Sequence, residues 1–285
     1  MISGRVLRHK LLIGAAAGVV TLWVNVGFTK VIPAGPSSAA DRWSYADIAD
    51  LFADAPLVLR ARITSAAALP GPRLPNGATR FYVEGSVVAL IRGNQAVAPH
   101  LVWLADLLPD SRGKFPKLKK VDVLIAALPV AGRASEIRLA ARAGQIFWTP
   151  ALEGRVRALV TSATAADAPP AITGVTSAFH TAGTITGEGE TQIFLSTVTK
   201  EPISLTVLTR PGQTKSWAFA LGEIVDEAAA PPARDTLGWY RLACFLPTAL
   251  PVTSTSELGE ADAEAARGDY AFVMQALGDC ERTRR

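Results

Sequence analysis

Residues 80–91, RFYVEGSVVALI, have the composition of a β-strand. The stretch is rich in β-branched and aromatic residues, and Arg92-Gly93 follows it, which is typical of a strand that ends at a turn. The segment before it, residues 56–64 (PLVLRARIT), has an alternating, β-rich pattern, and a Pro/Gly loop at residues 70–77 joins the two. We therefore predict two consecutive β-strands here.

Further strand-like segments continue this pattern along the chain, at residues 101–105, 121–128 and 136–140. Five short strands separated by turn residues predict a small β-barrel or sandwich. A helix is expected after them, because Thr149-Pro150 places a proline at a first helical position, and its apolar face ends near Thr164.

Another helix is expected before the strands. Ser44 is a good N-cap, with Asp47 three residues later, and Leu51 lies on the apolar face. Asp47, Asp50 and Asp54 fall on the opposite side of this helix. We expect these three carboxylates to form a solvated face, with a calcium site as the alternative.

The order of these segments resembles the netrin-module or metalloproteinase-inhibitor type of OB barrel. The resemblance covers residues 47–140 and rests on "APLVLRARI", "RFYVEGSVVALIRG" and the later "VDVLIAAL". Arg92-Gly93 stands where those modules have Lys-Gly, and the cysteines that they commonly carry in this region are absent. The resemblance implies an OB-like barrel and does not imply protease inhibition. The whole chain also resembles exported bacterial proteins, which implies export but no activity.

A second unit is expected after residue 170. Residues 191–197, 203–209 and 216–224 have strand patterns joined by ordinary turns, which predicts an antiparallel meander. Helices at about residues 233–246 and 261–277 close the chain. The predicted fold class is therefore α+β, with an OB-like barrel domain at residues 41–165 and an α+β domain at residues 170–285.

The N-terminal residues 1–30 have the pattern of an export signal or membrane anchor. Arg5, Arg8 and Lys10 precede an uncharged apolar run at residues 11–28, and residues 31–40 form a Pro/Gly/Ser linker. The basic flank predicts that the rest of the chain lies outside the cytoplasm, with the cytoplasmic membrane as partner of residues 11–28. Cleavage after residues 38–40 (SAA) and retention as an anchor are both compatible with this pattern.

The charge balance argues against nucleic acid as a partner. The chain has 29 basic and 25 acidic residues, but residues 1–40 hold four basic residues and no acidic ones. The exported part therefore has 25 of each, and its overall charge gives no support for nucleic-acid binding.

Both cysteines, Cys244 and Cys280, lie in the part predicted to be exported. Disulfides persist in oxidising compartments, so we predict a bond between them, with two buried free thiols as the alternative. Such a bond would close a loop of about 37 residues and contribute about 3–4 kcal/mol in the chain-entropy model.

Candidate chemistry is sparse, because the sequence lacks the common hydrolase, metalloprotease, nucleotide-binding and redox motifs. One cluster combines His180 with Glu188 and Glu190 in the glycine-rich segment FHTAGTITGEGETQ. On a sharply turned loop these groups could act as acid and base or bind a metal. The alternative is a solvated hairpin tip. We expect no bound metal or cofactor.

A second cluster is a basic run, Lys114, Lys117, Lys119 and Lys120, around Phe115 and Pro116. It could contact anionic lipid headgroups or envelope polymers, or it could be a solvated loop that enters a strand. Taken together, these features favour a non-enzymatic envelope protein with a binding or structural role. The second hypothesis is a hydrolase of an envelope substrate that uses His180, Glu188 and Glu190.

Overall fold

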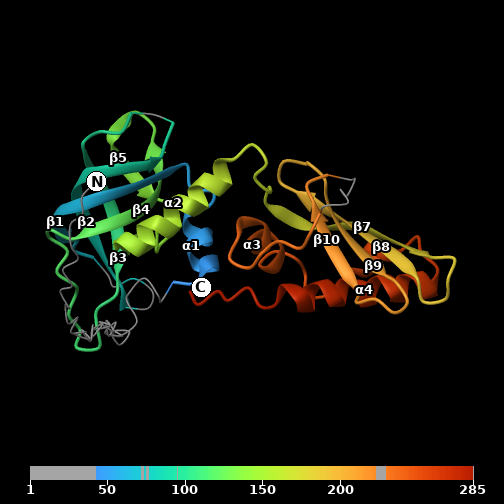
Figure 1. Cartoon of the computed structure of the whole chain (residues 1–285). Helices are drawn as coiled ribbons and strands as arrows, with labels where there is room; N and C mark the ends of the chain where they lie inside the picture. Colours follow the sequence, from blue (N-terminus) through green and yellow to red (C-terminus); the bar gives the residue numbers. More distant parts are fainter. Residues whose placement is uncertain (1–42, 72–73, 75–76, 95, 223–228, 285) are drawn as a thin grey trace, which may run out of the picture. The chain divides into compact units, whose positions relative to one another are not determined.

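A computed structural model describes residues 43–284 except 72–73, 75–76, 95 and 223–228, and Figure 1 shows its elements. The described residues have the predicted α+β fold class, with a closed five-stranded barrel, a separate antiparallel sheet and four α-helices. The predicted export segment at residues 11–28 and the linker at 31–40 lie outside the described residues. Among the helices that are described, none is long and apolar enough to cross a membrane.

The barrel follows the order β1-β2-β3-β5-β4, and an antiparallel pairing between β4 and β1 closes it. β3 and β5 pair in parallel at Val102 and Glu136, whereas the other barrel neighbours are antiparallel. A sixth strand, too short for its pattern to be recognised in the sequence, pairs with β4. The strands are β1 (Leu57–Ala68), β2 (Thr79–Arg92), β3 (His100–Leu107), β4 (Asp122–Val130), β5 (Arg133–Leu139) and β6 (Gln145–Phe147).

β4 is buried on both faces at residues 123–127 and β1 at residues 57–59, which explains the continuous apolar sequence of these two segments. Leu59 and Ile125 point into the barrel, whereas their neighbours Val58 and Leu124 point out into a second apolar cluster. Two helices cover that outer side: α1 (Tyr45–Phe52) and α2 (Pro150–Thr164). Alternate side chains of the same strand therefore pack inside the barrel and against the helices outside it.

Arg60 fixes α2 to the barrel through a polar network. Its guanidinium donates to Asp122 of β4 at 2.6 Å and to Glu153 of α2 at 3.3 Å, and stacks 3.8 Å from the ring centroid of Trp148. Arg62 donates to the same Asp122 at 2.6 Å. The hydrogen bonds from Arg62 and Arg60 outweigh burial and hold the pKa of Asp122 below its usual range.

Gly85 of β2 makes room for Trp103 in the barrel interior. A Cβ at position 85 would lie 2.8 Å from the Trp103 ring and 3.1 Å from the Arg62 carbonyl oxygen. We expect Gly85→Ala to lower the free energy of unfolding by about 1–3 kcal/mol, because the crowded ring must move. Urea unfolding measures this, with Gly174→Ala as the control, since a Cβ there would meet only Ser196 at 3.5 Å. Equal losses for both variants would contradict the packing argument.

The second sheet has four antiparallel strands in the order β10-β9-β8-β7. They are β7 (Ile172–Ala182), β8 (Gly189–Thr197), β9 (Ile203–Thr209) and β10 (Ser216–Ala220). The predicted meander of β8, β9 and β10 is therefore present, and the strand predicted at residues 216–224 ends at Ala220. β7 was not predicted from the sequence, and its last residues, 179–182, correct the interpretation of the segment FHTAGTITGEGETQ as a loop.

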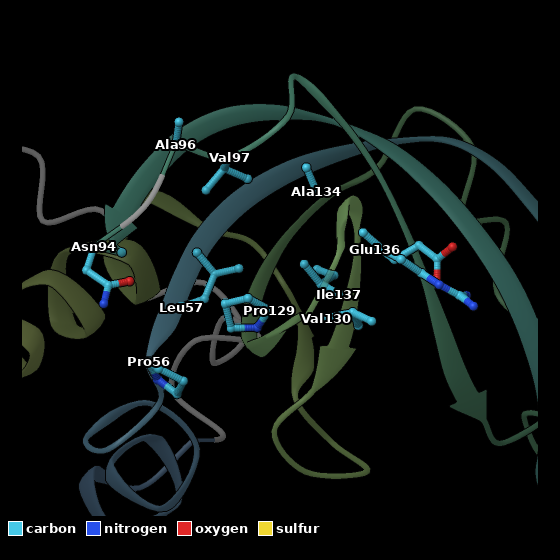
Figure 2. A pocket seen from close by; sticks show the side chains of 12 residues that line it. Pro56, Leu57, Asn94, Ala96, Val97, Pro129, Val130, Ala134, Glu136 and Ile137 are labelled. Atoms are coloured by element: carbon cyan, nitrogen blue, oxygen red, sulfur yellow. The ribbon is translucent and has the colours of Figure 1, made fainter.

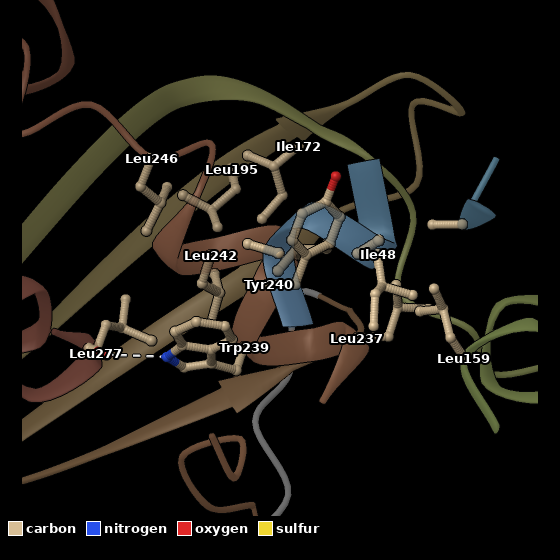
Figure 3. Packing of buried hydrophobic residues seen from close by; sticks show 14 of the residues in the cluster. Ile48, Leu159, Ile172, Leu195, Leu237, Trp239, Tyr240, Leu242, Leu246 and Leu277 are labelled. Carbon is tan, nitrogen blue, oxygen red and sulfur yellow. Dashed lines mark hydrogen bonds between the residues drawn. The ribbon is translucent and has the colours of Figure 1, made fainter. Parts of the chain in front are cut away.

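Helices from the end of the chain cover one face of this sheet. α3 (Leu237–Ala243) is shorter than predicted, η3 (Val252–Thr255) is a short 3-10 helix, and α4 (Glu260–Leu277) lies along the sheet in Figure 1. Figure 3 shows Trp239 of α3 among aliphatic side chains, with its indole Nε1 donating to the Leu277 carbonyl at 2.9 Å. Apolar residues from α1, α2, α3, α4 and the second sheet share this one cluster. The division into domains near residues 165–170 stays a prediction.

The disulfide between Cys244 and Cys280 is present, as predicted, with their Cα atoms 4.9 Å apart. It joins the residue after α3 to a residue just beyond α4. The same bond fixes the start of the C-terminal tail. Two residues later in the tail, Arg282 donates a hydrogen bond to the Cys244 carbonyl at 3.1 Å.

The acidic side of α1 is solvated only in part: Asp50 and Asp54 are exposed, as predicted, but Asp47 is buried, and the prediction was wrong for that residue. Asp47 Oδ1 accepts from the backbone N–H groups of Thr283 and Arg284 at 3.0 and 3.1 Å, and Asp50 pairs with Arg282 at 2.7 Å. We call this contact between α1 and residues 282–284 the C-terminal clasp. Asp54 instead pairs with Arg241 of α3 at 2.6 Å. The acids therefore hold other parts of the chain.

Candidate functional site

His180 lies on strand β7 and not on the loop predicted from the sequence. Its Cα partner on β8 is Thr191, whereas Glu190 is opposite Thr181. Because successive strand residues point to opposite faces, the side chains of His180 and Glu190 project from opposite sides of the sheet. Glu190 accepts a hydrogen bond from Gln192 at 2.9 Å. The structure therefore does not bring these two predicted residues together.

The groups that His180 does meet come from three distant elements. Its Nδ1 lies 2.8 Å from Thr191 Oγ1, and the Thr191 hydroxyl donates to Asp269 of α4 at 2.5 Å. Lys215, just before β10, donates to the other Asp269 oxygen at 2.5 Å. Thr191 and Asp269 are almost fully buried. No local sequence pattern links these residues, so the sequence interpretation missed Thr191, Lys215 and Asp269.

This network fixes which nitrogen of neutral His180 carries the proton. An ionised carboxylate can only accept, so the single Thr191 proton goes to Asp269 and the Thr191 oxygen must accept from His180. Nδ1 therefore carries the hydrogen, and Nε2 keeps its lone pair. A hydrogen bond at one ring nitrogen that sets the chemistry of the other is the usual way in which proteins orient histidine.

A groove of about 360 Å³ lies beside this network, between the β7–β8 hairpin and α4. His180, Glu188, Thr209, Lys215 and Gly268 are among its lining residues, so His180 and Glu188 of the predicted cluster do share a site. Among the described residues, the lining contains an imidazole, two carboxylic acid residues (Glu188 and Asp269), the Lys215 ammonium and a threonine hydroxyl, but no cysteine or serine. Within the described part of the chain, no group of three histidine, cysteine, aspartate or glutamate residues has a metal-binding arrangement.

The four predicted lysines lie on the loop between β3 and β4, and all four are exposed. We call residues 112–120 the lysine loop. Two apolar side chains anchor it: Phe115 packs edge-on against Phe81 at 5.2 Å between centroids, and Leu118 is buried in the barrel core. Lys120, with a φ of 68°, donates its backbone N–H to the Ile63 carbonyl at 2.8 Å. The loop therefore presents its charges from a fixed support.

Among the described residues, no ion pair involves the basic side chains of the lysine loop, which belong to Arg112, Lys114, Lys117, Lys119 and Lys120. The nearest acid in sequence, Asp110, accepts from the backbone N–H groups of Arg112 and Lys114 at 2.9 and 2.8 Å. Its carboxylate thus holds the turn that begins the loop.

A small cavity of about 80 Å³ lies at one end of the barrel. Figure 2 shows Leu57, Val97 and Ile137 gathered around it, with the carboxylate of Glu136 directed away. Glu136 pairs with Arg133 at 2.9 Å. The cavity is lined largely by apolar side chains, and it contains none of the candidate residues predicted from the sequence.

Comparison with known proteins gives no relative from which a role could be transferred. No protein-family model and no curated protein sequence matches this chain.

Proposed function

We propose that this protein is an exported or membrane-tethered envelope protein with a non-enzymatic binding role, and that the lysine loop binds an anionic surface. The disulfide is compatible with a location outside the cytoplasm, where such bonds persist. Residues 1–30 act in this proposal as a signal or as a membrane anchor, which would place the folded part beside a bilayer.

The barrel is, in this proposal, an OB-like module of the type that residues 47–140 resemble. Its strand order, closed by β4 against β1 and by the parallel contact between β3 and β5, supports that interpretation. Arg92, at the position of the family's lysine, donates to the Ala53 carbonyl at 2.6 Å and to the Ala55 carbonyl at 3.2 Å. This contact ties the end of α1 to β2. A fold alone does not specify a ligand, so the binding role is argued from the loop.

The observation that carries the proposal is a set of exposed, unpaired cations on an anchored loop. A lysine near an anionic membrane surface contributes about 1 kcal/mol to binding, and the attraction falls off over about one Debye length. Phe115 and Leu118 already hold the loop, so little conformational entropy would be lost when its lysines meet a surface. The ligand chemistry is a dense array of phosphate or carboxylate groups.

The double variant Lys117→Gln/Lys119→Gln is expected to weaken binding by about 2 kcal/mol, or about thirtyfold. The full chain in neutral-lipid nanodiscs would be titrated with phosphatidylglycerol vesicles and, separately, with soluble polyphosphate, at two salt concentrations. Tighter binding to one of these probes distinguishes a lipid headgroup from a polymer.

The matched control is Lys200→Asn/Arg210→Gln, which removes two exposed basic side chains from loops beside the second sheet. Asparagine suits position 200 because Lys200 has a φ of 64°. Equal binding by the two double variants, or binding that does not respond to salt, would refute a role for the lysine loop.

A further inference from the structure

We propose that the groove between the second sheet and α4 binds a neutral ligand through two neighbouring hydroxyl groups, one donating to Nε2 of His180 and one accepting from the Lys215 ammonium. Both residues line this groove, and its volume of about 360 Å³ is within the range of small-ligand sites. The site is separate from the lysine loop and does not rest on the function proposed above.

Strand register places three of the lining residues on the same face of the sheet. His180 is opposite Thr191 on β8, and Gly189, two positions earlier on β8, therefore points to the same side. Gly189 is in turn opposite Thr209 of β9, so the Thr209 hydroxyl lies on this side too. α4 covers this face, because Thr191 donates to Asp269 of that helix at 2.5 Å.

Lys215 lies at the other side of the groove from His180. β10 pairs with β9 so that the position before its first residue falls beside Thr209. Lys215 Nζ is 2.5 Å from Oδ1 of Asp269, and His180 Nδ1 is 3.9 Å from Oδ2 of the same carboxylate. One small ligand can therefore reach both the imidazole and the ammonium group.

The groove offers hydrogen-bond acceptors and donors together. Thr191 accepts from Nδ1 of His180, so Nε2 presents a lone pair. The Lys215 ammonium has three N–H donors, and one of them bonds to Asp269. Within the described part of the chain, the Thr209 hydroxyl has no hydrogen-bond partner. A hydroxyl group both donates and accepts, so two adjacent hydroxyl groups match this arrangement.

The charges in the groove balance, which favours a neutral ligand. Lys215 neutralises Asp269 through their ion pair, so an anion that meets the ammonium group also meets the carboxylate. Glu188 borders the groove, but its side chain lies on the other face of the hairpin, where a Cβ at position 183 would be 2.5 Å from its Cγ. Adjacent hydroxyl groups on a neutral molecule occur in sugars and in glycerol.

Glycine residues keep the groove open beside the imidazole. A Cβ at Gly189 would be 2.8 Å from Cε1 and 3.1 Å from Nε2 of His180, so any larger residue would displace the ring. Gly268 of α4 also lines the groove, and a Cβ there would meet nothing within 4 Å. Since the His180 side chain is 13% exposed, its free nitrogen is accessible from this space.

The test titrates the full chain in phosphatidylcholine nanodiscs at pH 8, followed by ligand-observed NMR. The probes are cis-1,2-cyclohexanediol, cyclohexanol, cyclohexylammonium and cyclohexanecarboxylate, which share one ring and differ in their polar groups. We expect saturable binding of the diol, with the other three at least tenfold weaker, and a shift of the His180 ring signals. Equal binding of diol and cyclohexanol, or preference for either charged probe, would overturn the proposal.

Two further probes distinguish the sources of such hydroxyl groups. Tighter binding of methyl α-mannoside than of glycerol indicates a saccharide, and the reverse indicates a glycerol headgroup of a lipid. Failure of both to compete with the diol would also contradict the proposal.

Two substitutions test the site without filling it. His180→Asn keeps an N–H donor for Thr191 but removes the Nε2 acceptor, and should weaken diol binding about tenfold. Thr209→Val keeps the side-chain shape and should weaken binding about threefold, whereas the control Thr181→Val, on the opposite face, should not change it. Circular dichroism checks that each variant folds. Unchanged affinity of His180→Asn, or equal affinities of the two valine variants, would refute the assignment.

Discussion

Replacing Asp47 by alanine is expected to lower the free energy of unfolding by about 3 kcal/mol, because its carboxylate serves both the start of α1 and the end of the chain. It accepts from the backbone N–H of Ser44 at 3.2 Å and from the Thr283 hydroxyl at 2.6 Å, in addition to two tail N–H groups. The lost half of the capping box costs about 1 kcal/mol, and each lost hydrogen bond to the tail costs about 0.5–1.5 kcal/mol, because the tail donors are exposed and can bond to water instead.

Urea unfolding of the full chain in neutral detergent measures this loss. Asp167→Ala is the control, since Asp167 is an exposed acid between α2 and β7. Hydrogen exchange should also show that the amide of Thr283 loses protection in Asp47→Ala. A loss no larger than that of the control would mean that the C-terminal clasp contributes nothing to stability.

The Asp47 carboxylate also makes the stability of the folded protein depend on pH, and the direction of this dependence can be predicted. Burial opposes ionisation of Asp47, but hydrogen bonds from Thr283 and Ser44 outweigh it and hold its pKa below the ordinary value of 3.8. A depressed pKa in the folded state stabilises the protein above the pKa of the unfolded state, and this contribution is lost as the pH falls through the folded value. The stability difference between wild type and Asp47→Ala should therefore be constant near neutral pH and shrink below about pH 4.

Removing the disulfide with Cys244→Ala/Cys280→Ala is expected to lower the free energy of unfolding by about 3–4 kcal/mol. The bond spans 36 positions and restricts the unfolded chain between α3 and the tail. Wild-type protein in excess dithiothreitol should match the variant in urea unfolding, and dithiothreitol should not change the variant. Unchanged wild-type stability after complete reduction would contradict this prediction.

The disulfide and the C-terminal clasp should act together. Cys280 lies two residues before Arg282, which contacts both Asp50 and the Cys244 carbonyl. Combining Asp47→Ala with the cysteine double variant should lower the free energy of unfolding by less than the sum of the two separate decreases. Either change alone already releases the tail, so the second change removes fewer of its contacts.

Candidate site residues could be predicted as a group only where they lie close together in the sequence. Lys114, Lys117, Lys119 and Lys120 could be identified as one cluster because they lie within seven positions, and their exposure follows from the alternation with Phe115 and Leu118. The partners of His180 could not be identified from the sequence, since Asp269 lies 89 positions away on another element. Glu190 was grouped with His180 by its place in the sequence, but strand pairing directs it to the opposite face.

The features that could be predicted from the amino-acid sequence are local ones. Alternating apolar residues specify β1 and β2, Ser44 and Thr149 cap α1 and α2, and two cysteines in a chain with an export pattern specify a disulfide. Each of these follows from a few neighbouring residues or from the cysteine count. Other features became visible only in the folded chain: residues 172–182 form an edge strand, Asp47 and Asp50 bind the tail, and Thr191 and Asp269 orient His180. The reason is that hydrogen bonds and ion pairs between distant segments depend on how the strands and helices pack, and no short pattern in the sequence records that packing.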